Sequence, residues 1–187
     1  MHVIETRLPG VKLIECSVFS DDRGFFLESY NAERYAAHGI TDVFVQDNHS
    51  RSAANVLRGL HYTIAHPQAQ TVYVSQGRIY DVVLDLRRNS PTFGGWAGFL
   101  LDAAKPSQIY MPAGCAHGFC VLSDYADVHY KCTQVYRAGD EGGVHWNDPD
   151  LAIDWPLTNP IVKPRDQAFP LLAHITVDRL PQVEFQS

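Results

Sequence analysis

The chain has 187 residues, of which 45% are apolar and 19% are charged, and its formal net charge is −6. This balance is typical of a soluble globular protein with a sizeable core. The acidic charge and the lack of a Lys/Arg run argue against nucleic acid as a partner. No run of about 18 apolar residues is present to span a membrane. The N-terminal residues lack the pattern of a signal peptide, so we expect a single cytoplasmic domain over residues 1–187.

Short strands account for most of the predicted elements, because runs of β-branched and aromatic residues alternate with turn residues. In chain order the expected strands are Lys12–Phe19, Gly24–Tyr30, Val43–Gln46, Val56–Tyr62, Thr71–Ser75, Ile79–Leu86, Trp96–Asp102, Gln108–Met111, Gly118–Leu122 and Asp127–Tyr136. A short helix is predicted over Ala32–Ala37, with Asn31 as its N-cap. After Asp148 the chain is rich in proline, which predicts an extended C-terminal wrap. The pattern indicates an all-β, antiparallel sandwich or barrel such as a jelly roll.

The expected strand Val56–Tyr62 carries side chains that a core strand does not need. Strict alternation would place Arg58 and His61 on opposite faces of the sheet. Gly59 lies between them and can host a β-bulge that turns both side chains to one side. An isolated histidine is more often a core residue, but a neutral imidazole in a pocket is a general base near pH 7. The run predicts a pocket wall that binds an anion and moves a proton.

Two other segments offer groups with matching chemistry. Tyr130, in the expected strand Asp127–Tyr136, is either a core aromatic or a proton donor on the face opposite His61. Arg23, in the turn before Gly24, is either a surface cation or a partner of Arg58. Two guanidinium groups suit a diphosphate, because each can form paired hydrogen bonds to phosphate oxygens.

The segment Pro112–His117 resembles the second signature of the cupin family of jelly-roll barrels, Pro-x-Gly-x-x-His, in which the histidine is a metal ligand. The first cupin signature, with a His-x-His pair and a glutamate, is missing around His61. Three ligands with a regular spacing are therefore not visible. The resemblance implies a cupin-like antiparallel jelly-roll barrel, and we expect it to hold no metal.

Seven stretches that cover most of the chain carry a closer resemblance. They are Asp21–Ser29, Phe44–Ser50, Val56–Tyr62, Ser90–Gly94, Ala116–Ser123, Tyr130–Thr133 and Glu141–Pro149. In this order they resemble the dTDP-4-dehydrorhamnose 3,5-epimerase family. The resemblance implies a homodimer of jelly-roll subunits that uses no metal and no organic cofactor and acts on a nucleotide-diphosphate sugar. The implied reaction inverts C3, C5 or both centres of a 4-keto-6-deoxyhexose by proton removal, enolate formation and reprotonation.

The same resemblance implies roles for individual residues. His61 would be the general base, held by Asp166, and Tyr130 would be the general acid. Arg23 and Arg58 would hold the diphosphate. The other implied ligand contacts are Glu28, Gln46 and Asn48 to the nucleotide and sugar, Tyr136 to the thymine, and His117, Glu141 and Arg165 at further positions.

The chain departs from the family pattern at Gln70, where the family places a lysine close to the substrate. Glutamine is a neutral donor, and losing one oxyanion donor costs roughly 10²–10³ in turnover. Either the chain is a 3,5-epimerase that tolerates this change, or it epimerises one centre only or acts on a different nucleotide sugar. Two other classes stay open at this point, a metal-dependent cupin enzyme and a sugar-nucleotide binding protein without catalysis.

Overall fold

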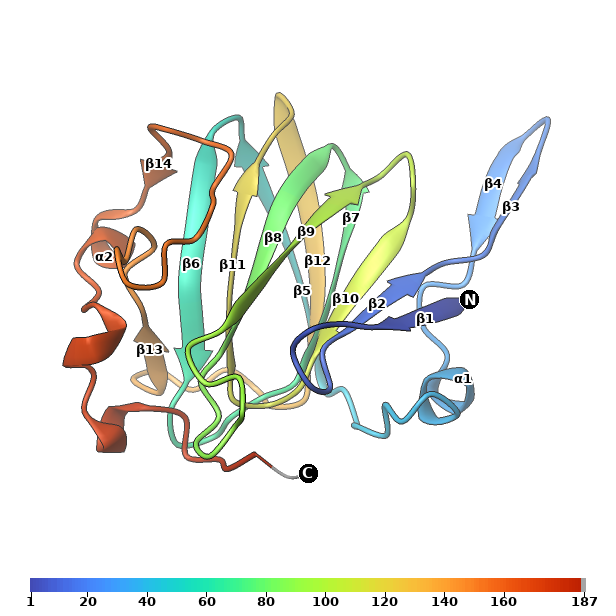
Figure 1. The fold of residues 1–187 in the computed structure, drawn as a ribbon. Helices are drawn as coiled ribbons and strands as arrows, with labels where there is room; N and C mark the ends of the chain where they lie inside the picture. Colours follow the sequence, from blue (N-terminus) through green and yellow to red (C-terminus); the bar gives the residue numbers. More distant parts are fainter. Residues whose placement is uncertain (186–187) are drawn as a thin grey trace.

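Two sheets face one another and form the body of the molecule, in a computed structural model that describes residues 1–185 (Figure 1). The first sheet has the order β1 (His2–Glu5), β2 (Lys12–Glu15), β10 (Ser107–Met111), β7 (Gln70–Gln76), β12 (Tyr125–Cys132) and β5 (Gln46–Ala53). The second has the order β13 (Glu141–Gly143), β6 (Val56–Thr63), β11 (Cys115–Val121), β8 (Arg78–Asp85) and β9 (Trp96–Asp102). These pairs are antiparallel, and β14 (Ile161–Val162) adds to β6 in parallel. The architecture is a cupin-like jelly roll, which confirms the all-β prediction.

The space between the sheets is filled by the apolar side chains that alternate along their inner faces. Val72 and Val128 from the first sheet belong to the same buried cluster as Ile79, Phe119 and Val121 from the second. Because successive side chains of a strand point to opposite faces, the strand pattern that predicted these elements also places this core. The core fills one part of the barrel, and polar side chains occupy another part of the same inner faces.

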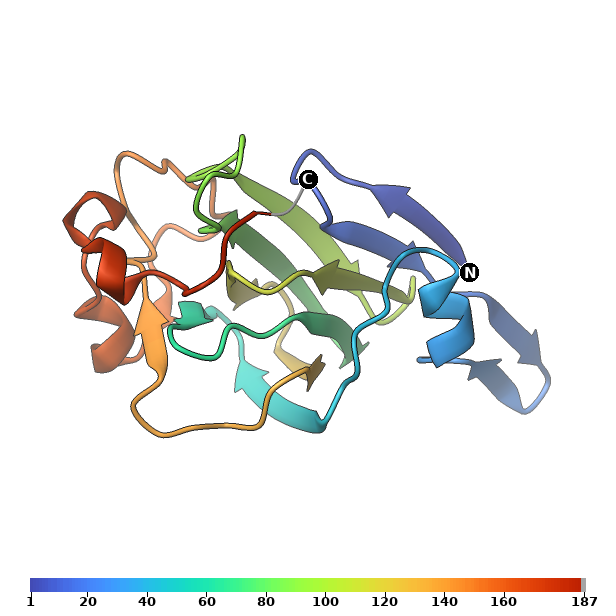
Figure 2. The ribbon, with the colours of Figure 1, turned by 90° about the horizontal axis from the view of Figure 1, so that it is seen from below.

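The C-terminal segment covers the outer face of the second sheet, on the side of the barrel away from β3 and β4 (Figures 1 and 2). It contains α2 (Pro164–Gln167), η1 (Leu172–His174) and η2 (Val177–Arg179) as well as β13 and β14. Leu60 and Leu84 of the sheet are fully buried in a cluster that includes Trp155 and Leu180. The predicted wrap is therefore present, although it is broken into short helices and strands. No helix within residues 1–185 is long and apolar enough to cross a membrane.

A hairpin of β3 (Val18–Asp21) and β4 (Gly24–Leu27) projects from the barrel, next to α1 (Ala32–Ala36) (Figure 1). The predicted helix is confirmed, because the Asn31 side chain accepts a hydrogen bond from the Arg34 backbone N–H at 3.2 Å. The expected strand Lys12–Phe19 is wrong in one respect. It divides between the barrel and the hairpin.

The largest error of the strand prediction lies at β5. The sequence favoured a strand over Val43–Gln46, but the strand begins at Gln46 and continues through the polar residues to Ala53. Polar strands are hard to recognise because β-propensity mainly reports burial of apolar side chains. The inner-facing residues Asn48 and Ser50 line a cavity, which explains why an interior strand has a polar face.

Candidate active site

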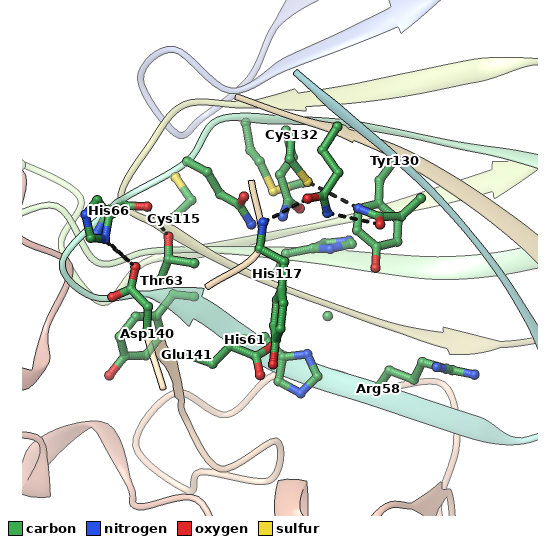
Figure 3. A pocket seen from close by; sticks show the side chains of 18 of the residues that line it. Arg58, His61, Thr63, His66, Cys115, His117, Tyr130, Cys132, Asp140 and Glu141 are labelled. Carbon is green, nitrogen blue, oxygen red and sulfur yellow. Dashed lines mark hydrogen bonds and ion pairs between the residues drawn. The ribbon is translucent and has the colours of Figure 1, made fainter. Parts of the chain in front are cut away.

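A cavity of about 350 Å³ is lined by side chains from both sheets (Figure 3). This volume lies in the range of small-molecule sites. Ten of the predicted site residues line it: Gln46, Asn48, Arg58, His61, Gln70, His117, Tyr130, Tyr136, Glu141 and Arg165. The residues that the sequence assigned to one site are therefore brought together by strands that are far apart along the chain.

Gly59 creates the irregularity that brings Arg58 and His61 to the same cavity. His61 is opposite His117 on β11 and Arg58 is opposite Phe119, so three residues of β6 span the length of two on β11. Gly59 has a φ of 125°, and a Cβ there would lie 2.5 Å from the Cα of Gly118. Only glycine fits this backbone position, which confirms the predicted bulge.

His61 is held from behind by a buried carboxylate. Its Nε2 lies 2.9 Å from Oδ2 of Asp166, whose side chain is 3% exposed. The same carboxylate accepts hydrogen bonds from the backbone N–H of Gly59 at 3.3 Å and from Nε of Arg165 at 3.2 Å. Burial raises the pKa of Asp166, but these donors and His61 outweigh it, so the pKa lies below its ordinary value. An ionised carboxylate only accepts, so this contact favours a hydrogen on Nε2 and a lone pair on Nδ1.

Arg165 connects this pair to the cavity. Its Nη1 lies 2.9 Å from Oε2 of Glu141, and its Nη2 lies 3.2 Å from Nε2 of His61. The guanidinium also lies over the ring of Phe169. The segment that carries Asp166 is thus fastened to β13 and β6 at the position of the predicted base.

A second histidine–aspartate pair lies beside the first. Nε2 of His117 is 2.7 Å from Oδ2 of Asp81, which is fully buried on β8. The other oxygen of Asp81 has no hydrogen-bond partner among residues 1–185. The sequence prediction included His117 but missed Asp81, because an aspartate inside the apolar run Ile79–Leu86 gave no sign of its partner on another strand.

Tyr130 enters the cavity from the first sheet, while His61 enters it from the second. Burial raises the pKa of Tyr130, Cys132 and Glu141 act in the same direction, and Arg58 opposes them. The phenol therefore keeps its proton at neutral pH. A base and a protonated acid on opposing walls of one cavity can remove a proton from one face of a ligand and return one to the other.

The side-chain amides of Gln46 and Asn48 form a hydrogen-bonded group on the first sheet, the sheet that also carries Tyr130. Nε2 of Gln46 donates to Oδ1 of Asn48 at 3.1 Å, and Nδ2 of Asn48 lies 3.6 Å from the sulfur of Cys132. Oε1 of Gln46 accepts from the backbone N–H of Tyr136 at 2.8 Å. These contacts fix the loop that carries the exposed ring of Tyr136 at the cavity mouth.

The opposite rim holds a pair that the sequence prediction missed. Nδ1 of His66 lies 2.9 Å from Oδ2 of Asp140, whose oxygens also accept the backbone N–H groups of Ala65 and His66 at 2.6 and 3.1 Å. The pair joins the loop after β6 to the loop after β12 (Figure 3). No pattern in the sequence indicated that Asp140 contacts residues about 75 positions away.

Two predicted ligand residues lie outside the cavity of a single chain. Arg23, at the tip of the hairpin, lies 2.5 Å from Asp21 across the turn and is almost fully exposed. Glu28 follows β4, where Oε1 lies 3.3 Å from Arg34. In one chain, therefore, Arg23 is not brought to Arg58 to form the expected diphosphate clamp.

The donor set for a metal is incomplete. Within the part of the chain that the structure describes, no group of three or more His, Cys, Asp or Glu side chains is placed to hold a metal ion. The cupin-like histidine, His117, is instead engaged by Asp81. The metal-dependent cupin alternative therefore lacks the three converging ligands that such a site requires.

Comparisons with known proteins give a consistent result. A family model described as dTDP-4-dehydrorhamnose 3,5-epimerase matches residues 5–174. A Pseudomonas aeruginosa protein of that name is 50% identical over 89% of this chain and 93% of its own length. A Neisseria gonorrhoeae protein of the same name is 47% identical over 90% of this chain, which spans 52% of that longer protein. A Streptomyces niveus protein named dTDP-4-dehydrorhamnose 3-epimerase is 44% identical over 89% of this chain and 81% of its own length.

A solved structure extends the similarity to the whole fold. The Legionella pneumophila dTDP-6-deoxy-D-glucose-3,5-epimerase, crystallised with dTDP-4-keto-L-rhamnose, is 46% identical. It superimposes with a TM-score of 0.95, covering 100% of this chain and 99% of its own.

Proposed function

The chain belongs to the dTDP-4-dehydrorhamnose 3,5-epimerase family, and we propose that it inverts C3 and C5 of a dTDP-linked 4-keto-6-deoxyhexose. The members of this family are isomerases. The observation that carries the proposal is the placement of His61, backed by Asp166, and Tyr130 on opposing walls of one cavity.

The first step is proton removal by His61. A 4-keto group acidifies the C–H bonds at C3 and C5, because the electron pair left on carbon moves to the keto oxygen. Nδ1 of His61 takes the proton, and the Asp166 carboxylate stabilises the imidazolium that forms. The enolate carries its negative charge on O4, so a hydrogen-bond donor in place at that oxygen lowers the barrier.

The second step is reprotonation from the other face. The Tyr130 hydroxyl donates its proton to the carbon, the C=O bond re-forms and the centre is inverted. One turnover leaves a proton on His61 and a phenolate at Tyr130, and exchange with solvent restores both groups. The same two groups act at C3 and at C5 when the ring presents each carbon in turn.

Substrate binding requires a second copy of the chain in this proposal. Arg58 is one of the cations that line the cavity, and its Nε donates to Oγ of Ser52 at 2.9 Å. Phe19, Phe25 and Phe26 of the hairpin are each more than 60% exposed, which is unusual for a stable surface. A homodimer in which the hairpin of one copy lies over the cavity of the other would bury these rings and bring Arg23 and Glu28 to the nucleotide.

Deuterium uptake tests the function directly. The protein is incubated in D₂O with dTDP-4-keto-6-deoxyglucose, and label at C3 and C5 is followed by NMR. We expect uptake at both carbons in the wild type, no uptake in His61→Asn, and loss of inverted product in Tyr130→Phe, with both variants still binding dTDP. Uptake at a single carbon would instead identify a monoepimerase, and no uptake with intact binding would identify a binding protein.

A further inference from the structure

Gln70 occupies the inner wall of the cavity close to the proposed acid. It begins β7, where its cross-strand neighbour is Cys132, and two residues further on Val72 is opposite Tyr130. Residues two apart on a strand share a face, so the side chains of Gln70, Cys132 and Tyr130 belong to the same inner face. Gln70 is therefore opposite Cys132, the neighbour of the proposed acid on the same inner face of β12.

The side-chain oxygen of Gln70 lies among buried polar groups. The thiol of Cys132, the cross-strand neighbour of Gln70, receives Nδ2 of Asn48 at 3.6 Å. Oε1 of Gln70 is buried and has no hydrogen-bond partner within residues 1–185. A buried acceptor without a donor costs free energy, so such groups usually find a partner. The last side-chain torsion of glutamine, χ3, adopts a broad range of angles. A small rotation about it can therefore turn the oxygen toward a ligand in the cavity.

We propose that Gln70 selects the substrate by accepting a hydrogen bond from a ring hydroxyl at C2 or C3 of the sugar, an inference that rests on the proposed function. A keto oxygen has no hydrogen to donate, so it does not satisfy Oε1. A 4-keto-6-deoxyhexose linked through C1 retains hydroxyls only at C2 and C3. The sequence suggested that Gln70 is a donor to the enolate oxygen, whereas the structure leaves the acceptor of its amide without a partner within residues 1–185.

The position next to Tyr130 favours the sugar ring over the nucleotide as the source of this hydroxyl. The predicted nucleotide contact Tyr136 is in an exposed loop at the cavity mouth, whereas Gln70 lies on the strand that supports the proposed acid. A site that hydrogen-bonds a substrate hydroxyl rejects analogues that lack it, because its own polar atom is then left unpaired. Gln70 therefore discriminates against 2-deoxy or 3-deoxy sugars, depending on which hydroxyl it holds.

A binding cycle tests this inference without relying on turnover. Dissociation constants for dTDP-4-keto-6-deoxyglucose, its 2-deoxy and 3-deoxy analogues and dTDP itself are measured by calorimetry. The protein is His61→Asn, alone and combined with Gln70→Met, so that no ligand is consumed. We expect the methionine change and removal of one hydroxyl each to weaken binding roughly 10- to 100-fold, and to weaken it no further when combined. Affinity for dTDP should not change.

Independent, additive losses for both analogues would overturn the inference, as would an equal loss of affinity for dTDP. Gln70→Lys in the otherwise wild-type protein gives a second test, because an ammonium donates but cannot accept. We expect it to lower kcat/KM, and a rise in turnover would show that the site needs a donor. Failure of the proposed function looks different, since the wild type would then exchange no deuterium while the binding cycle still reports on Gln70.

Discussion

His61 and His117 are direct neighbours on β6 and β11 and each is paired with a buried aspartate, yet the two pairs are built differently. Asp166 comes from α2 in the C-terminal segment, and its two oxygens also receive a backbone N–H and Arg165. Asp81 comes from the adjacent strand β8, and its Oδ1 has no partner in the described chain. The side chain of His61 is 31% exposed and that of His117 is 14% exposed.

This difference suits His61 to the proposed role of general base and His117 to that of a fixed hydrogen-bonding group. A carboxylate with several donors holds its charge and its orientation, and it stabilises the imidazolium that a base becomes. His61 has both this support and access to the ligand. His117 is more deeply buried and its carboxylate has fewer donors, so it is better suited to hold one hydrogen-bonding geometry than to cycle a proton.

The strongest test of this comparison replaces each histidine by asparagine. His61→Asn should lower deuterium exchange by about 10³–10⁴-fold, because it removes the proton acceptor itself. His117→Asn is the matched control. It should lower the rate of deuterium exchange by about 10-fold, since it removes one hydrogen bond. Exchange rates measured by NMR at saturating substrate make the comparison. Equal losses in the two variants would mean that both histidines move protons.

Removing the charge behind the base should have the next largest effect. Asp166→Asn keeps the shape of the side chain but removes its negative charge. The amide stabilises the Nε2–H tautomer of His61 less strongly, and its NH₂ group cannot accept the hydrogen bonds that the carboxylate accepts. We expect roughly a 100-fold loss in kcat with a smaller change in KM. A loss confined to KM would show that Asp166 serves binding of the substrate and not orientation of the base.

Many residues of this site could be predicted from the sequence, but the contacts between residues far apart along the chain could not. The bulge at Gly59 was predictable because a glycine between two polar residues of a strand lets the backbone depart from strict alternation, and β5 was missed because its inner face is polar. Asp81 and Asp140 were not found, since each acts through a partner more than 30 positions away. The pairing of Arg23 with Arg58 at a diphosphate stays a prediction, since within one chain Arg23 lies on a projecting hairpin away from the cavity.

The carboxylate behind His61 should also tie the stability of the fold to pH. The pKa of Asp166 is lowered in the folded protein, so its contribution to stability is present above the unfolded value of about 3.9 and is lost as pH falls through the folded pKa. Asp166→Asn should therefore lower the free energy of unfolding by about 1–3 kcal/mol at pH 7. The gap from the wild type should shrink as pH drops below about 4 in urea titrations. A gap that stays constant to pH 3 would contradict the ionised pair.

Asp81→Asn provides a smaller test of the second pair. Asparagine can still accept a hydrogen bond from His117, but it loses the charge that strengthens it. We expect about a fivefold loss in kcat/KM and an unchanged pH profile of kcat, because the change weakens one hydrogen bond and removes no proposed proton transfer. A shifted pH profile would place His117 among the groups that move protons and remove the distinction between the pairs.

The smallest effect is expected at the rim, where a third histidine–aspartate pair lies apart from the reacting centre. His66 is 46% exposed on its side chain, and exposed ion pairs contribute about 0.2–1 kcal/mol. His66→Ala should raise KM about two- to fivefold and leave kcat unchanged, because the pair fixes two loops at the cavity mouth and touches neither His61 nor Tyr130. Asp140→Asn should be more damaging, since Asp140 also receives two backbone N–H groups. A fall in kcat for His66→Ala would show that the rim is coupled to the chemistry, and the contrast between a proton-moving pair and purely supporting pairs would no longer hold.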